Sequence, residues 1–270
     1  YNEAGNLRRL TEEWLAEAEA LARTGYQLTV IPVDDRSTDD TLAIARQLAQ
    51  EQARVRVIAH AVNQNLGGVV KTAIGDFLQM SQSGDLMCLM DGDDTHKPRF
   101  IHGMLAKITR EKQCVIASRY QPGARVQGLQ ASRKLFSDGA RLYYTLVLHV
   151  PGVKDYTCGY RVYTRPALQA GVARYGQALV EKKSFACMME LLYKLYRCGC
   201  TFPLYPVLGQ QGGREQDEPG QDHPGQLPHS FEAAGAGMRS QEKAWTKTSG
   251  KREKPPDRAM LCQAVSVWCH

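Results

Sequence analysis

The chain has 270 residues, of which 43% are hydrophobic and 23% charged, so it is long enough to fold around one large core. The net charge of +6 favours an anionic ligand or an anionic membrane surface. The sequence lacks a Lys/Arg block with interleaved aromatic residues, which makes nucleic acid the weaker option. No apolar run approaches the ~20 residues of a membrane span, and the cysteines form no C-x-x-C pair, so we expect a reducing, cytoplasmic protein.

Two hydrophobic patterns alternate along the first two thirds of the chain. Apolar residues at intervals of three and four predict helices at 7–21, 40–51, up to about 80, 98–112, 132–148, from 166 onward and at 184–197. Short apolar runs predict strands at 28–33, 55–59, 86–90, 114–117 and 201–207, and a strand-like piece after 154–161. Strands that alternate with helices indicate an α/β fold with a mostly parallel, doubly wound sheet.

Carboxylates follow two of the predicted strands. Asp34 and Asp35 end the strand at 28–33, and Asp91 and Asp93 follow the apolar run at 86–90. Strand ends of this kind meet at one edge of an open α/β sheet, where such folds bind ligands. Closely spaced carboxylates repel one another unless a cation joins them, and their oxygens suit Mg²⁺ or Mn²⁺. The alternative is that these residues only cap the following helices, and two clusters at one edge argue against it.

Six short segments occur in a characteristic order, at residues 1–3, 33–41, 63–71, 90–98, 117–120 and 154–161. Together they resemble the motifs of the family 2 (GT-A fold) glycosyltransferases, especially the dolichol- or polyprenyl-phosphate mannosyl- and glucosyltransferases. The sequence departs from the family at Arg36 and Asn65, where Gly is usual, and at Lys71, where Arg is usual. Asn readily adopts the left-handed conformation, so its replacement of Gly is mild. In the family a first strand precedes the segment that Tyr1-Asn2-Glu3 resembles, and we expect this strand to be missing from the chain. The resemblance implies a Rossmann-like three-layer GT-A domain over residues 1–208.

For the donor, the resemblance implies a nucleotide-diphosphate sugar, based on GDP or UDP, held with Mg²⁺ or Mn²⁺. Asp91 and Asp93 would be the metal ligands, and Asp93 a catalytic residue as well. The cation would stabilise the nucleoside diphosphate as it leaves. Lys71 would contact the phosphates, with a solvated helix face as the alternative. The substrate-binding residues implied for the donor are Tyr1, Asn2, Glu3, Asp34, Asp35, Asn63, Lys71 and Asp91.

For the acceptor, the resemblance implies a polyprenyl phosphate at a membrane surface. Arg119, Arg133 and Arg161 could grip its phosphate, because guanidinium binds phosphate in a bidentate manner. The catalytic candidates on the acceptor side are Arg119, Arg133 and Asp155, and Arg161 is a substrate-binding candidate. Asp155 would either orient the acceptor or, for a hydroxyl acceptor, act as a general base. A sugar or polysaccharide hydroxyl acceptor and an inactive nucleotide-binding fragment both stay open.

The composition changes at about residue 209. Residues 209–225 are rich in Gly, Gln and charge, and the rest of the chain contains few large apolar side chains, which is typical of a disordered tail. Codons for 210–225 can be chosen so that a shifted reading frame encodes the family's G-x-S-K-M segment. We therefore expect residues 209–270 to be either a low-complexity, disordered tail or the product of a frameshift. We expect the preceding domain to be peripheral at the cytoplasmic face of the membrane.

Overall fold

A computed structural model of the chain describes residues 1–118, 126–127, 148–206, 209–210 and 259–266. The predicted helix at 132–148 therefore falls almost wholly outside the described residues, as do Arg119 and Arg133.

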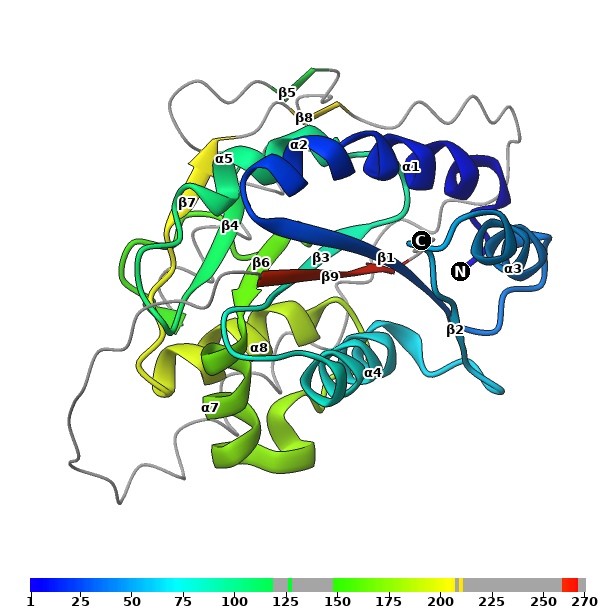
Figure 1. Ribbon diagram of the computed structural model, residues 1–270. Coiled ribbons are helices and arrows are strands. Elements are labelled where there is room, and N and C mark those ends of the chain that lie inside the picture. Colours follow the sequence, from blue (N-terminus) through cyan, green and yellow to red (C-terminus); the bar gives the residue numbers. More distant parts are fainter. Residues whose placement is uncertain (119–125, 128–147, 207–208, 211–258, 267–270) are drawn as a thin grey trace. The chain divides into compact units, whose positions relative to one another are not determined.

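A seven-stranded sheet lies at the centre, with the strand order β2-β1-β9-β3-β6-β4-β7 (Figure 1). Its strands are β1 (Tyr26–Asp34), β2 (Ile58–Ala59), β3 (Leu86–Asp91), β4 (Cys114–Ser118), β6 (Arg161–Thr164), β7 (Leu204–Pro206) and β9 (Ala259–Ser266). All neighbours in this sheet are parallel except β6, which is antiparallel to both β3 and β4. A separate parallel pair joins β5 (Val126–Gln127) to β8 (Gly209–Gln210). The prediction of a mostly parallel central sheet is confirmed.

Helices cover both faces of the sheet. Figure 1 shows α1 (Ala4–Ala16), α2 (Ala18–Arg23) and α5 (Ile101–Leu105) on one face, and α4 (Asn65–Met80), α7 (Arg165–Tyr175) and α8 (Ala186–Arg197) on the other. The helix α3 (Thr41–Glu51) packs against α1. Leu86 to Met90 in β3 are all buried, because a strand covered on both faces has no solvent side. The three-layer α/β arrangement expected from the sequence is thus present.

Several predicted elements are shorter in the structure. The helix expected at 7–21 is divided between α1 and α2. The helix expected at 98–112 is reduced to the 3-10 turn η1 (Pro98–Phe100) and α5, because the Gln113 side-chain oxygen accepts hydrogen bonds from the Thr109 and Arg110 N–H groups, both at 2.7 Å. The strand expected at 55–59 contributes only β2 and a single bridge between Val55 and Val30. Side-chain competition for backbone groups explains the shorter helix, and a lack of pairing partners explains the shorter strand.

The tail was expected to be largely disordered, and the described part of it contains one long strand. Its residues Ala259–Ser266 form β9, which pairs in parallel with β1 on one side and with β3 on the other. Without a strand in this position, β1 and β3 would have unpaired backbone groups in the middle of the sheet. The sequence offered a usable local signal that had not been recognised, since Ala259-Met260-Leu261-Cys262 and Ala264-Val265 are apolar and only Gln263 interrupts them.

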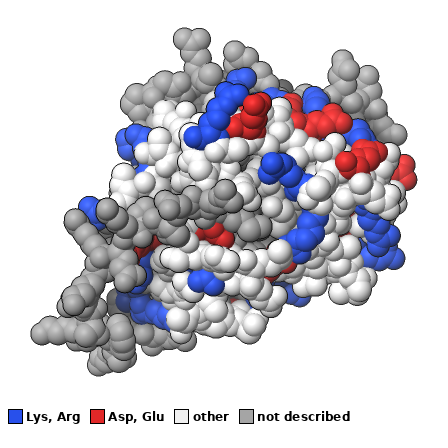
Figure 2. All heavy atoms as spheres, viewed as in Figure 1, with Lys and Arg blue, Asp and Glu red and all other residues white. Residues whose placement is uncertain are grey.

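The described surface carries charged side chains of both signs. On the face shown in Figure 2, the basic side chains of the described residues occupy several separate places, with acidic side chains beside them along the upper edge. This face therefore carries mixed charge. Among the described residues, no helix is long and apolar enough to cross a membrane.

Burial also governs the cysteines. Of those in the described residues, Cys88, Cys114, Cys158, Cys187 and Cys200 are buried. Burial raises the pKa of Cys114, Cys187 and Cys200 to about 12 in each case, because a thiolate is poorly solvated in the interior.

Candidate active site

The carboxyl end of β1 carries two buried carboxylates. Asp34 is 1% exposed and Asp35 is 2% exposed. The Ser37 N–H donates to Asp34 Oδ2 at 3.2 Å, whereas the buried Asp34 Oδ1 has no hydrogen-bond partner among the described residues. Buried polar atoms are normally paired, so Asp34 Oδ1 is a suitable acceptor for an N–H or O–H group of a ligand.

Asp35 is held by two hydrogen bonds to the same oxygen. The Gln64 N–H and the His60 imidazole Nδ1 each lie 2.7 Å from Asp35 Oδ1. An ionised carboxylate only accepts hydrogen bonds, so the His60 Nδ1 carries the hydrogen. The other ring nitrogen, Nε2, lies 2.8 Å from Thr72 Oγ1 on α4. His60 therefore connects the end of β1 to α4.

The N-terminal segment lies beside the residues that follow β1. The Asn2 N–H donates to Ser37 Oγ at 3.0 Å, and the Thr38 N–H donates to Asn2 Oδ1 at 2.9 Å. The Glu3 N–H donates to Thr41 Oγ1 at 2.8 Å. Tyr1 is half-buried and Glu3 is buried. The structure thus brings the 1–3 and 34–41 segments together at one edge of the sheet.

The segment at 63–71 forms the start of α4. The Asn63 side chain donates to the Asp35 carbonyl oxygen at 3.0 Å and accepts from the Asn65 N–H at 3.1 Å. Asn65 has a φ of 60°, the left-handed conformation for which Gly was the expected residue. Lys71 is exposed on α4. Asn63 therefore shapes the turn beside Asp35, and Lys71 stays accessible to solvent.

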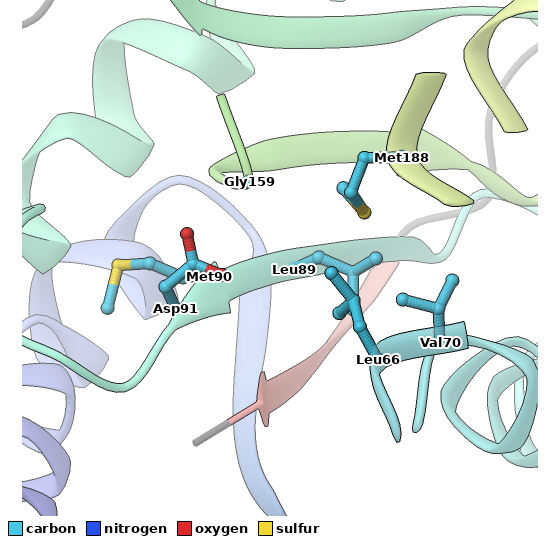
Figure 3. Close-up of a pocket in the computed structure, with 7 residues that line it drawn as sticks. All are labelled: Leu66, Val70, Leu89, Met90, Asp91, Gly159 and Met188. Carbon is cyan, nitrogen blue, oxygen red and sulfur yellow. The ribbon is translucent and has the colours of Figure 1, made fainter. Parts of the chain in front are cut away.

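The carboxyl end of β3 lies at the same edge as that of β1, because both strands run parallel to β9. Asp91 ends β3 and is half-buried, and Asp93 follows it in the next turn. Asp93 Oδ1 accepts hydrogen bonds from the Thr95 N–H at 3.0 Å and from the Thr95 hydroxyl at 2.6 Å. Figure 3 shows Asp91 at the side of a small pocket, facing the backbone of Gly159. The other residues that line this pocket are apolar: Leu66, Val70, Leu89, Met90 and Met188.

These two carboxylates fit a cation that is shared with a phosphorylated ligand. Among the described residues, no cluster of three or more His, Cys, Asp or Glu side chains could hold a metal ion by itself. Mg²⁺ is usually bound through one or two carboxylates, with substrate phosphates and water completing its shell. The oxygen donors of Asp91 and Asp93 match that pattern.

Asp94 anchors the acidic turn to α1, which the sequence did not indicate. Its carboxylate lies 2.7 Å from Arg9 Nη2 and 2.7 Å from Lys97 Nζ, and Lys97 also lies 3.1 Å from Glu13 Oε1. Asp94 has a φ of 61°, so the chain reverses sharply here. These ion pairs fix the turn that contains Asp93 against the first helix.

The acceptor candidates occupy different positions. Asp155 is 1% exposed and its Oδ1 accepts from the Thr157 and Cys158 N–H groups, at 3.2 and 3.1 Å. Arg161 is fully buried, and its guanidinium donates to the carbonyl oxygens of Tyr156, Cys158 and Met188 at 2.7–2.8 Å. Contrary to the expectation of a phosphate ligand, Arg161 lies in the interior and stabilises the backbone around it. Arg119 and Arg133 lie outside the described residues.

Three features of the site were not expected from the sequence: His60, Gly159 and the Asp94 ion pairs. A histidine directly after the strand-like run 55–59 was a usable signal for the first. The Asp94 ion pair with Arg9 joins residues that are far apart in the chain, and no local sequence pattern predicts such a contact.

Acidic side chains at the carboxyl ends of β1 and β3, on a mostly parallel sheet covered by helices, define an α/β protein with a candidate ligand site at this edge of the sheet. The profile of Glycosyl transferase family 2 matches residues 1–171, and the chain belongs to this family of glycosyltransferases.

Two relatives are similar over much of the chain. A polyprenol monophosphomannose synthase from Mycolicibacterium smegmatis is 28% identical over 182 residues, which cover 67% of this chain and 66% of the relative. An undecaprenyl-phosphate mannosyltransferase from Micrococcus luteus is 30% identical over 179 residues, which cover 66% of this chain and 70% of the relative. The chain therefore spans about two thirds of the length of these relatives.

Proposed function

We propose that the chain transfers a hexose from a GDP- or UDP-sugar to a polyprenyl phosphate, with Mg²⁺ or Mn²⁺ as cofactor. The observation that carries the proposal is the convergence of Asp34 and Asp35 with Asp91 and Asp93 at one edge of the sheet. The names of the two relatives support mannose as the hexose and a polyprenyl phosphate as the acceptor.

The donor would lie across the carboxyl ends of β1 and β3. Asp34 and Asp35 would bind the base and ribose, with Tyr1, Asn2 and Glu3 beside them. The unpaired Asp34 Oδ1 supports this assignment, because a ligand N–H or O–H would satisfy it. Asn63 holds the turn next to Asp35, and the exposed Lys71 would approach the phosphates from α4.

Asp91 and Asp93 would hold the cation on the donor diphosphate. When bound, Mg²⁺ or Mn²⁺ supplies charge neutralisation for the departing nucleoside diphosphate. An oxygen of the acceptor phosphate attacks the anomeric carbon, and the bond from that carbon to the diphosphate oxygen breaks. A phosphate monoester is already anionic at neutral pH, so this acceptor needs little help from a general base.

Arg119 and Arg133 remain our proposal for the groups that bind the acceptor phosphate. Their guanidinium groups offer the paired N–H donors that a phosphate accepts. The reaction would take place where the lipid acceptor lies, with the domain peripheral at the cytoplasmic face of a membrane.

The test separates binding from turnover. GDP-mannose, UDP-glucose and the free nucleotides are titrated with Mn²⁺, and transfer of labelled hexose to a short polyprenyl phosphate is assayed in detergent. We expect metal-dependent binding of one donor and labelled lipid product that EDTA abolishes. Binding without transfer would indicate an inactive fragment, transfer only to a sugar hydroxyl would exclude the lipid phosphate, and a lack of any nucleotide binding would refute the proposal.

A further inference from the structure

We propose that Gly159 is a positioning residue that sets the orientation of the Asp91 carboxylate, and that Asp155 and Arg161 hold Gly159 in place. The inference rests on the proposed function, in which Asp91 shares a cation with the donor diphosphate. It gives Asp155 and Arg161 a role in the donor half of the site.

The register of the sheet brings Gly159 to Asp91. In the antiparallel pair of β3 and β6, Leu86 lies opposite Thr164 and Leu89 lies opposite Arg161. Continued by two residues, the same register places Gly159 opposite Asp91. Directly opposed residues of an antiparallel pair direct their side chains to the same face, so any side chain at position 159 would point at the Asp91 carboxylate.

The contact leaves no room for a side chain at position 159. A Cβ built on Gly159 would lie 2.7 Å from Asp91 Oδ1, 2.8 Å from Asp91 Cγ and closer still to Oδ2. Gly159 is not among the described glycines with a positive φ, so its backbone conformation is open to other residues. The close approach of Asp91 is therefore the reason for glycine here. Figure 3 shows this approach, with the Asp91 carboxylate directed toward the Gly159 backbone.

The turn that carries Gly159 is held from both sides. Before it, Asp155 Oδ1 accepts hydrogen bonds from the Thr157 N–H, the Thr157 hydroxyl and the Cys158 N–H. After it, the buried Arg161 guanidinium donates to the Tyr156 and Cys158 carbonyl oxygens of the same turn. A third bond, to the Met188 carbonyl oxygen at 2.7 Å, ties the turn to α8.

The hydrogen bonds of the turn decide whether the turn or the Asp91 side chain would move if a side chain were introduced at position 159. The turn is fixed by five hydrogen bonds from two buried side chains, and the three nearest atoms that a Cβ at position 159 would meet all belong to the Asp91 carboxyl group. A methyl group at position 159 would therefore displace the Asp91 carboxylate. A ligating carboxylate that leaves its productive orientation binds the cation more weakly, and loss of such supporting contacts typically costs about 10- to 100-fold in metal affinity.

The experiment measures Mn²⁺ binding without turnover, by the electron paramagnetic resonance signal of free Mn²⁺ in the presence of GDP or UDP. We expect Gly159→Ala to raise the Mn²⁺ dissociation constant about 10- to 100-fold while circular dichroism shows a folded chain. The matched control is Gly75→Ala in α4, where a Cβ meets nothing within 4 Å, and it should bind Mn²⁺ like the wild type.

A second pair of variants tests the support of the turn and covers the case in which Gly159→Ala does not fold. Asp155→Asn keeps an oxygen that can accept the turn's N–H bonds and should retain Mn²⁺ binding, whereas Asp155→Ala should lose affinity in the manner of Gly159→Ala. Equal Mn²⁺ binding by wild type, Gly159→Ala and Asp155→Ala would overturn the inference and leave the proposed function standing. No Mn²⁺ binding by the wild type with either nucleotide would overturn both.

Discussion

His60 and Asp35 form a buried hydrogen-bonded pair, in which the imidazole Nδ1 lies 2.7 Å from the carboxylate Oδ1. The Gln64 N–H reaches the same oxygen, also at 2.7 Å. Because both bonds use Oδ1, a donor group of a ligand would meet Oδ2. The pair therefore orients a carboxylate that we assign to nucleotide binding.

The first prediction concerns this pair. His60→Ala removes one of two hydrogen bonds from a buried carboxylate, and bonds to charged groups contribute about 1.5–3 kcal/mol. We expect nucleotide affinity to fall about tenfold or more, as measured by isothermal titration with Mn²⁺ and GDP or UDP. His102→Ala, at a half-exposed histidine paired with Glu17, is the control and should leave nucleotide affinity unchanged. Equal nucleotide affinity of the His60→Ala and His102→Ala variants would show that His60 does not support the donor site.

The second prediction compares two glycines of α4. A Cβ on Gly67 would lie 3.0 Å from the Lys182 carbonyl carbon and 3.2 Å from Lys183 Cα, whereas a Cβ on Gly75 meets nothing within 4 Å. Gly67→Ala should lower the free energy of unfolding by about 1–3 kcal/mol, because backbone must move to admit the methyl group. Gly75→Ala should raise it by up to about 1 kcal/mol through helix propensity. Urea denaturation measures both, and the same sign for the two variants would contradict the close packing at Gly67.

The third prediction concerns the ion pairs of Asp94. Lys97 loses some stabilisation to desolvation, but its bonds to Asp94 and Glu13 outweigh this and raise its pKa. Lys97→Met should therefore reduce the free energy of unfolding by up to about 1 kcal/mol at low salt, and by less at high salt. Arg23→Ala breaks an exposed pair with Glu19 and should have almost no effect. If the loss in free energy of unfolding caused by Lys97→Met does not change with salt, Lys97 stabilises the fold by packing and not by its charge.

The fourth prediction is a pH dependence. Burial tends to raise the pKa of Asp39, but hydrogen bonds from Thr41 and Ala4 outweigh it and lower the pKa below the usual 3.8. A carboxyl group whose pKa is lower in the folded state stabilises the fold above its unfolded pKa. That contribution is lost as the pH falls through the folded pKa.

Asp39→Asn provides the comparison, because it cannot ionise. The difference in free energy of unfolding between wild type and Asp39→Asn should shrink as the pH falls below about 3.8. Chemical denaturation at a series of pH values measures it. A difference that stays constant through this range would show that the Asp39 charge does not stabilise the fold.

Much of the fold was predictable from local patterns. The apolar run 86–90 and the helix that ends at Met80 were identified because burial on both faces, or on one helix face, leaves a strong periodic signal. The lengths of α5 and β2 were not predictable, because the Gln113 side chain limits α5 and strand pairing limits β2. The position of β9 depends on two partners far away in the sequence, and no local pattern could specify it.

The positions of the candidate site residues were predictable where they follow strands, and unpredictable where tertiary contacts decide them. Asp34, Asp35, Asp91 and Asp93 were identified by their place after strands, and the structure puts them at one edge of the sheet. Arg161 was expected to bind phosphate, since its sequence neighbours do not reveal that three carbonyl oxygens surround it.

Three buried cysteines, Cys114, Cys187 and Cys200, should resist thiol reagents in the folded chain. A thiol must ionise and be reached to be alkylated, and burial opposes both at Cys114, Cys187 and Cys200. Alkylation at these positions therefore requires the surrounding segments to open, so its rate reports how often β4, α8 and the chain before β7 separate from their neighbours. The chain thus carries its own probes of local opening, and mass spectrometry of timed alkylation could rank these segments by stability without any added label in the sequence.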